Sequence, residues 1–302
     1  MFRFIRPLFY MLLVNILIMV MINIILGALG VSPSMGGYGR PVQYESLLIF
    51  CFVWGIAGAF ISLQMSRWLA KRMHGLEMVD ENHRYSALCR RVHDLATRAG
   101  LPAMPEVAVY ESPEVNAFAT GPSRSRSLVA VSTGLLRQMD AKEVDGVLAH
   151  EVSHIANGDM VVMTLVQGVV NAFVMFFARV ATLFLDQMLR GDDREEGGGL
   201  GYFGSIMVNQ LLHVVFGLLS YPLVAWVSRQ REYRADAGGA SLAGPGSMVA
   251  ALERLKQSYP SLESREASTQ VMNISGRLSS WSELMSTHPS LDDRIARLRR
   301  QL

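Results

Sequence analysis

The sequence is short of charged residues. Only 18% of its 302 residues are Asp, Glu, Lys or Arg, against roughly a quarter in ordinary soluble proteins. Two cysteines, Cys51 and Cys89, are too few for a disulfide framework or a zinc knuckle, and we interpret both as buried thiols. A net charge of +2, with no basic stripe that carries interleaved aromatic residues, argues against a nucleic-acid partner. The shortage of charge is concentrated in long stretches, which indicates membrane spans.

Four stretches without Asp, Glu, Lys or Arg are long enough to cross a bilayer, which takes about 20 mostly apolar residues. They are residues 7–29, 46–65, 160–178 and 200–228. The first is too long for the apolar core of a secretory signal and lacks a small-residue cleavage site, so we expect a retained anchor. For the last two, a buried helical hairpin of a soluble domain remains an alternative, because polar residues such as Gln167 and His213 interrupt them.

Basic residues predict the orientation, because cytoplasmic flanks of membrane spans are rich in Lys and Arg. Arg3 and Arg6 precede the first span. Arg67, Lys71 and Arg72 follow the second, and Arg229, Arg231 and Arg234 follow the fourth. The connector 30–45 has a single basic residue, and the connector 190–202 has an acidic excess. We therefore expect a protein with four spans whose two termini and region 66–159 are cytoplasmic.

These spans divide the chain into four parts. They are an N-terminal transmembrane hairpin (1–65), a first cytoplasmic part (66–159), a second transmembrane hairpin (160–228) and a second cytoplasmic part (229–302). In the first cytoplasmic part, helical spacing over 82–99 is followed by three β-like runs, at 106–111, 116–121 and 127–136. Asp140 and Glu143 have the spacing of a capping box that starts a helix near Ala141. A small sheet with helices is the predicted architecture.

That last helix carries the pattern His150-Glu151-x-x-His154. Residues four apart lie on one face of a helix, so both imidazoles can bind one metal ion, and Glu151 lies close enough to reach a water on it. Two imidazoles and a carboxylate would leave a fourth position of a zinc ion open, which is the catalytic arrangement. The alternative is an ordinary pair of histidines on a helix face.

A third metal ligand must come from elsewhere in the chain. Candidates are Asp159, Glu232, Asp236, Glu253 and His288. Because the second hairpin leaves and returns at the same membrane face, Glu232 should arrive beside the two histidines, with Asp236 placed to orient one of them. A solvated cluster of charges beside the membrane is an equally good interpretation of "SRQREYRAD", and the residues alone leave both open.

Three motifs in order, "HEVSHIANGD", "SRQREYRADAGGA" and "THPSLDDRIARL", with spans placed as above, resemble the HtpX family of membrane-integrated zinc metalloproteases, relatives of the CAAX prenyl endopeptidases. The resemblance implies a mainly α integral membrane protein with an α+β metalloprotease domain of gluzincin type that contains a small β-sheet. It implies one Zn²⁺ per chain, bound by His150, His154 and Glu232. It also implies Glu151 as the general base and Asp236 as a residue that supports the ligands.

The same resemblance implies roles in substrate binding and catalysis. The segment "NAFATG" matches the family's segment that pairs with substrate backbone, which points to Asn116, Ala117, Phe118 and Ala119. Related enzymes suggest that a His and an Arg near "HPSLDDR" contact the oxyanion, which makes His288 a candidate catalytic residue. From the residues alone, "THP" is a helix start, and we expect the arginines at 294, 297, 299 and 300 to form a solvated helix face.

The function expected from these features is hydrolysis of polypeptide substrates, namely damaged or misfolded membrane proteins, in stress response and protein quality control. The family connection places it in a bacterial inner membrane, with the lipid bilayer as a second partner and the active site on the cytoplasmic side. One alternative is a prenyl-protein endopeptidase, although those enzymes have more spans. Another is a non-proteolytic metal-binding membrane protein, which would need more ionisable residues within the spans. The sequence makes no prediction of the oligomeric state.

Overall fold

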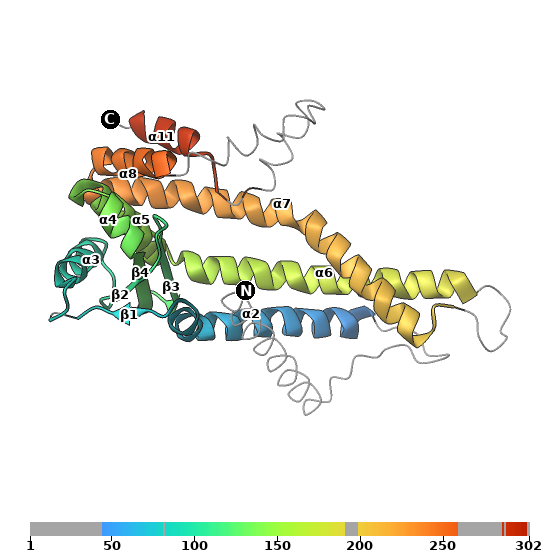
Figure 1. Ribbon diagram of the computed structural model, residues 1–302. Helices are drawn as coiled ribbons and strands as arrows, with labels where there is room; N and C mark the ends of the chain where they lie inside the picture. Colours follow the sequence, from blue (N-terminus) through green and yellow to red (C-terminus); the bar gives the residue numbers. More distant parts are fainter. Residues whose placement is uncertain (1–43, 81, 191–198, 259–285, 287, 301–302) are drawn as a thin grey trace. The chain divides into compact units, whose positions relative to one another are not determined.

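The computed structural model describes residues 44–80, 82–190, 199–258, 286 and 288–300 (Figure 1). Its elements in chain order are α2 (Tyr44–His74), β1 (Glu77–Met78), α3 (Ser86–Arg98), β2 (Glu106–Tyr110), β3 (Ala117–Ser123), β4 (Arg126–Ser132), α4 (Thr133–Gln138), α5 (Ala141–Asn157), α6 (Asp159–Arg190), α7 (Gly201–Ala243), α8 (Pro245–Ser258) and α11 (Leu291–Arg299). The predicted span 7–29 lies outside the described residues.

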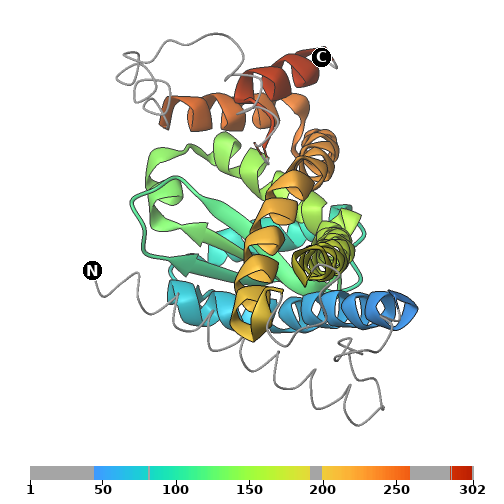
Figure 2. The ribbon, with the colours of Figure 1, turned by 90° about the vertical axis from the view of Figure 1, so that its right-hand side faces the viewer.

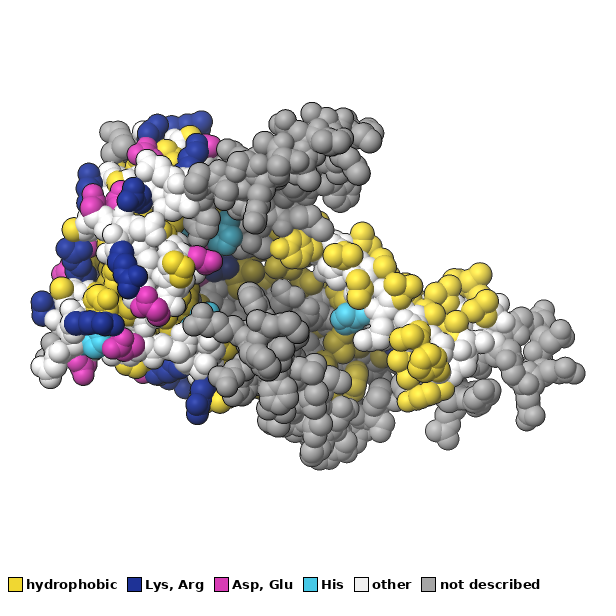
Figure 3. All heavy atoms as spheres, in the orientation of Figure 1, with side chains coloured by type: hydrophobic (Ala, Val, Ile, Leu, Met, Phe, Trp, Pro, Cys, Tyr) yellow, Lys and Arg dark blue, Asp and Glu magenta, His cyan; other side chains and the backbone are white. Residues whose placement is uncertain are grey.

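Three of these helices, α2, α6 and α7, are long and apolar enough to cross a membrane. α2 and α6 contain the predicted stretches 46–65 and 160–178, and α7 contains all but the first residue of the stretch 200–228. Many of their large apolar side chains are exposed, among them Phe60, Phe184 and Leu219. On the face shown in Figure 3, hydrophobic side chains gather over the apolar part of α7, and Lys, Arg, Asp and Glu gather over the sheet and the helices around it. This distribution fits contact with lipid and disfavours a hairpin buried in a soluble domain.

The chain forms two compact units. The first comprises the described residues within 1–62 and 164–224, and the second those within 63–163 and 225–302. In the first unit, α2 and α6 approach each other closely through small residues. A Cβ atom on Gly55 would lie 2.5 Å from the carbonyl oxygen of Gly168 and 3.0 Å from the Cβ of Ala172. Small residues at such crossings are typical of packed membrane helices.

The second unit contains a four-stranded mixed sheet with the order β1-β2-β4-β3. β2 runs parallel to β4, with Glu106 opposite Leu128, whereas β3 runs antiparallel to β4, with Ala117 opposite Val131. The prediction of a strand through residue 136 was wrong: β4 ends at Ser132, whose hydroxyl accepts a hydrogen bond from the backbone N–H of Leu135 and so caps α4. In this sheet β3 is an edge strand.

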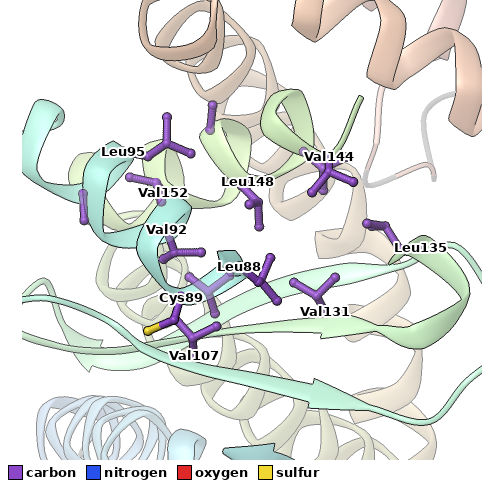
Figure 4. Close-up of a cluster of buried hydrophobic side chains, with 14 of the residues drawn as sticks. Leu88, Cys89, Val92, Leu95, Val107, Val131, Leu135, Val144, Leu148 and Val152 are labelled. Carbon is purple, nitrogen blue, oxygen red and sulfur yellow. The ribbon is translucent and has the colours of Figure 1, made fainter. Parts of the chain in front are cut away.

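Helices α3 and α5 cover one face of this sheet (Figures 2 and 4). Buried side chains from α3 (Leu88, Val92), β4 (Val131) and α5 (Leu148) form the core between them. The predicted capping box is confirmed: the Asp140 carboxylate accepts hydrogen bonds from the backbone of Lys142 and Glu143, and the Glu143 carboxylate accepts one from the N–H of Asp140. The start of α5 and its packing against the sheet fix the position of the His-Glu-x-x-His pattern.

The contact between α5 and α8 predicts a stability effect at Gly146. A Cβ atom there would lie 2.4 Å from the backbone carbonyl oxygen of Ser247, which cannot rotate away. Although alanine favours helices, Gly146→Ala should therefore lower the stability of the folded protein, by about 1–3 kcal/mol. Thermal unfolding in detergent would measure it. Gly246→Ala in α8 is the matched control, because its Cβ would meet only the end of the Lys142 side chain, at 3.5 Å; equal effects of the two substitutions would contradict the prediction.

Candidate functional site

Two helices bring three potential metal ligands together. His150 and His154 lie on α5 and Glu232 on α7, and all three side chains are buried. The two Nε2 atoms are 3.1 Å apart, and the Glu232 carboxylate oxygens lie 3.6 Å from Nε2 of His150 and 3.5 Å from Nε2 of His154. Ligand atoms of a tetrahedral ion with bonds of about 2.0–2.1 Å are about 3.3 Å apart. The three side chains therefore fit a single metal ion.

A carboxylate contacts the second ring nitrogen of each histidine. Nδ1 of His150 lies 3.0 Å from the Asp236 carboxylate, and Nδ1 of His154 lies 2.6 Å from that of Asp159. A carboxylate at Nδ1 keeps the proton on that nitrogen and leaves the Nε2 lone pair for a metal ion. Asp236 thus lies where its expected supporting role requires.

Asp159, weighed above as a third ligand, occupies a different position. It is fully buried, and its carboxylate contacts the side of the His154 ring that faces away from the three-ligand cluster. The reason is the turn at Gly158, whose positive φ of 70° ends α5 and starts α6 at Asp159. Glu253, another candidate, forms an exposed ion pair with Arg299 instead.

Glu151 is half-buried on α5 and lines the same cavity as the histidines. Burial raises the pKa of its carboxyl group, although the nearby histidines and a hydrogen bond from the backbone N–H of Ala119 counteract this. For His154, burial lowers the pKa, but hydrogen bonds to Asp159 and Glu232 outweigh it and raise the pKa to about 9. A carboxylate with a raised pKa next to a cation site is a suitable general base.

The cavity has a volume of about 410 Å³ and one wall formed by Asn116, Ala117, Phe118 and Ala119. These residues lie at the start of β3, which pairs with β4 on one side only within the described sheet. The other edge of β3 faces α5, as the hydrogen bond between Ala119 and Glu151 shows. A larger cavity of about 730 Å³, between α3 and the end of α7, has no His, Cys or Glu among its described lining residues, so the chemistry belongs to the smaller one.

The expectation of a solvated arginine face was wrong for Arg294. This residue is buried, and its guanidinium donates two hydrogen bonds to the Asp236 carboxylate, at 2.8 and 2.6 Å. Its third nitrogen lies 3.3 Å from the Glu232 carboxylate. Arg294 is buried together with Ile295 and Leu298 on one face of α11, and this apolar spacing could have indicated an inward position. The arginines at 297, 299 and 300 are exposed, as expected.

His288 and Arg231 complete the surroundings of the cluster. His288 is mostly exposed, lines the cavity, and has its Nδ1 atom 3.3 Å from the Glu232 carboxylate. Arg231, considered above only for its charge, also lines the cavity, and its Nε atom lies 3.5 Å from the Asp159 carboxylate. Because Arg231 directly precedes Glu232 in the sequence, its presence near the site could have been predicted.

Comparison with known proteins agrees with this geometry. The sequence profile of peptidase family M48 matches residues 82–302, which include every element of the site. The chain belongs to peptidase family M48. It is 48% identical over 282 residues to "Protease HtpX" of Idiomarina loihiensis, covering 93% of this chain and 92% of that protein. It is 44% identical to "Protease HtpX homolog" of Methylacidiphilum infernorum, covering 98% of both chains.

Among solved structures, the crystal structure of S. mikatae Ste24p has a similar fold. The TM-score is 0.63 at 18% sequence identity, and the match covers 98% of this chain and 64% of that chain. The comparisons confirm the HtpX resemblance and the expected fold class, a mainly α membrane protein with a metalloprotease domain that contains a small sheet. The M48 protein described here is therefore a membrane metalloprotease, which requires a metal ion and acts on polypeptides.

Proposed function

We propose that this M48 protein is a zinc endopeptidase of gluzincin type that cleaves damaged membrane proteins on the cytoplasmic side of a bacterial inner membrane. The observation that carries the proposal is the buried cluster of His150, His154 and Glu232, with Glu151 beside it in one cavity. Nitrogen and carboxylate donors suit zinc, and a protein that supplies three ligands leaves the fourth position for water or substrate. One ion per chain is expected.

When bound, zinc would polarise the scissile carbonyl and lower the pKa of water to about 7. In the proposed reaction, Glu151 removes a proton from the attacking water and then delivers it to the leaving amine. Its half-buried position and raised pKa suit both steps. Asp236 and Asp159 hold the two imidazoles with Nε2 toward the cluster.

Arg294 links the two carboxylates of α7, since it contacts both Asp236 and Glu232. Through these contacts it is proposed to fix the side chains that surround the metal ion. His288 lies at the cavity's exposed side, and we propose that it contacts the oxyanion that forms during peptide hydrolysis.

The substrate is proposed to bind as an added strand along 116–119. Edge β3 presents backbone groups toward α5 and Glu151, and backbone hydrogen bonds from such an edge bind extended peptides with little dependence on side chains. This mode fits an enzyme that removes many different damaged proteins. The named HtpX relatives match over nearly their full length, which favours this function over cleavage of prenylated proteins.

Purified protein in proteoliposomes with a membrane-protein substrate provides the test. We expect new N-termini, detected by mass spectrometry, whose formation stops with a zinc chelator and returns when zinc is added. Cleavage that persists after complete removal of metal would exclude the proposed chemistry. In inverted membrane vesicles, whose outer surface is the cytoplasmic one, cleavage of substrate segments on the inner side alone would exclude the proposed orientation.

The contact between Asp159 and His154 predicts a loss of metal affinity in Asp159→Asn. The amide keeps the shape of the side chain but does not fix the imidazole with the strength of a carboxylate at 2.6 Å. Loss of such a partner typically costs about 10–100-fold in metal affinity or activity. Competition with a chromophoric chelator measures zinc affinity. Asp145→Asn, an exposed carboxylate of the same helix paired with Arg91, is the control; identical affinities in the two variants would refute the role of Asp159.

A further inference from the structure

We propose that the turn between β3 and β4, residues 123–126, together with the basic end of α2, binds anionic lipid headgroups and thereby fixes the strand that receives the substrate. We call these residues the basic collar: Arg67, Lys71 and Arg72 on α2, and Arg124 and Arg126 on the turn. The lipid contact itself is independent of the proposed function. Only its effect on cleavage rests on that function.

The level of the collar relative to the bilayer follows from α2. Its uncharged part, 46–66, is about 31 Å long at 1.5 Å per residue, which matches a hydrocarbon core of about 30 Å. The helix continues without a break to His74, so Arg67 is its first charged residue beyond the core. Trp68 follows and is exposed, and tryptophan is enriched at the membrane–water interface. The end of α2 thus lies at the headgroups.

A hydrogen bond places the turn beside this end of α2. Nη2 of Arg126 donates to the side-chain oxygen of Gln64, at 3.2 Å, and Gln64 lies one helical turn before Trp68. Arg124 is exposed and makes no hydrogen bond or ion pair with any residue that the structure describes. The guanidinium of Arg124 is therefore available to a headgroup beside Trp68, and so are the N–H groups of Arg126 other than the one that binds Gln64.

The charge of the collar is strongly one-sided. Arg67 and Lys71 share the single carboxylate of Glu106, each at 2.8 Å, and no acidic residue contacts Arg72, Arg124 or Arg126 within the described part of the chain. An excess of arginine at a membrane surface binds anionic lipids, and each basic residue there contributes roughly a fivefold gain in affinity. Anionic phospholipid is the occupant that this charge and position fit.

β3 connects the turn of the collar to the residues that line the cavity. β3 runs from the cavity wall at Ala117 and Ala119 directly to the turn. At its far end, Gly121 lies so close to β4 that a Cβ atom would be 2.2 Å from the carbonyl oxygen of Arg126, and its φ is +148°. This close crossing fixes the turn against the strand pair. Binding of the turn to headgroups would therefore hold the edge of β3 steady beside Glu151.

The test compares cleavage of one membrane-protein substrate in vesicles of phosphatidylcholine alone with cleavage in vesicles that also contain phosphatidylglycerol. Wild-type kcat/KM should rise at least about threefold with the anionic lipid, since two or more arginines contribute. The double variant Arg124→Gln/Arg126→Gln should match wild type in phosphatidylcholine and lose the rise. The control Arg90→Gln/Arg137→Gln removes the same charge from exposed sites on α3 and at the end of α4, and should keep it. A rise that survives in the double variant, or no rise in wild type, would overturn the proposal.

A second measurement is independent of protease activity. Cys51 and Cys89 are buried, so a fluorophore on Ser125→Cys reports on the exposed turn alone. We expect spin-labelled phosphatidylglycerol headgroups to quench it at least about threefold more than spin-labelled phosphatidylcholine at equal label density, with the difference lost on adding Arg124→Gln/Arg126→Gln. Equal quenching by the two lipids would reject the contact even if the enzyme were inactive. Inactivity in every lipid together with selective quenching would instead count against the proposed function only.

Discussion

Glu151→Gln is expected to abolish peptide hydrolysis and to leave the metal content unchanged. The substitution keeps the shape of the side chain and its place beside His150 and His154, but an amide cannot accept a proton from water. Because a positioned general base contributes about 10²–10⁴-fold to the rate, kcat should fall by at least about 100-fold. Since Glu151 is not one of the three clustered ligands, the zinc stoichiometry should stay that of wild type.

The measurement pairs metal analysis of the purified variant with cleavage of a membrane-protein substrate. Glu253→Gln serves as the control, because it removes a carboxylate from an exposed surface pair with Arg299 and should change neither quantity. Activity within a few-fold of wild type in Glu151→Gln would mean that another group takes the proton. Loss of zinc together with activity would mean that Glu151 helps to bind the metal, and the assignment of the base would fail.

Much of this site could be predicted because its signals are local. The spacing of His150 and His154 needs only helical geometry, and the capping box at Asp140 and the glycine at position 158 fix where that helix begins and ends. Glu232 required one further step, the return of a hairpin to the membrane face that it left. That step is a constraint of the bilayer, but by itself it left a solvated charge cluster as an equal alternative. Only the resemblance to the HtpX family singled out Glu232.

The contacts of Asp159 and Arg294 were harder to predict than the histidine pair, because each depends on packing between elements. Asp159 reaches Nδ1 of His154 because a glycine in the left-handed conformation ends α5 directly before it. Arg294 looked like part of a charged helix surface, and its burial follows from Ile295 and Leu298 packing against α8. Similarly, the apolar run after Ser132 favours a continuing strand, but the Ser132 hydroxyl caps α4 and the chain becomes helical there. Local propensity does not decide such cases.

Glu232→Ala is expected to remove zinc binding. Glu232 is the only one of the three clustered residues that comes from α7, and its carboxylate faces both Nε2 atoms, at 3.6 and 3.5 Å. Losing a ligand should lower zinc affinity by more than the roughly 10–100-fold expected when a supporting carboxylate is lost. The order of affinities should therefore be wild type, then Asp159→Asn, then Glu232→Ala.

The effect of Glu232→Ala on stability must be measured separately from its effect on zinc affinity, because Arg294 loses a buried partner when the Glu232 carboxylate is removed. Glu232→Gln keeps the volume and one oxygen atom, and thermal unfolding of the zinc-free proteins tells whether either variant is destabilised. A variant that unfolds like zinc-free wild type but no longer binds zinc in chelator competition supports the assignment. Stoichiometric zinc in a folded Glu232→Ala protein would contradict it. Another group of the cavity would then have to complete the ligand set, because Asp236, like Asp159, contacts a histidine at Nδ1, on the side of the ring that faces away from the cluster.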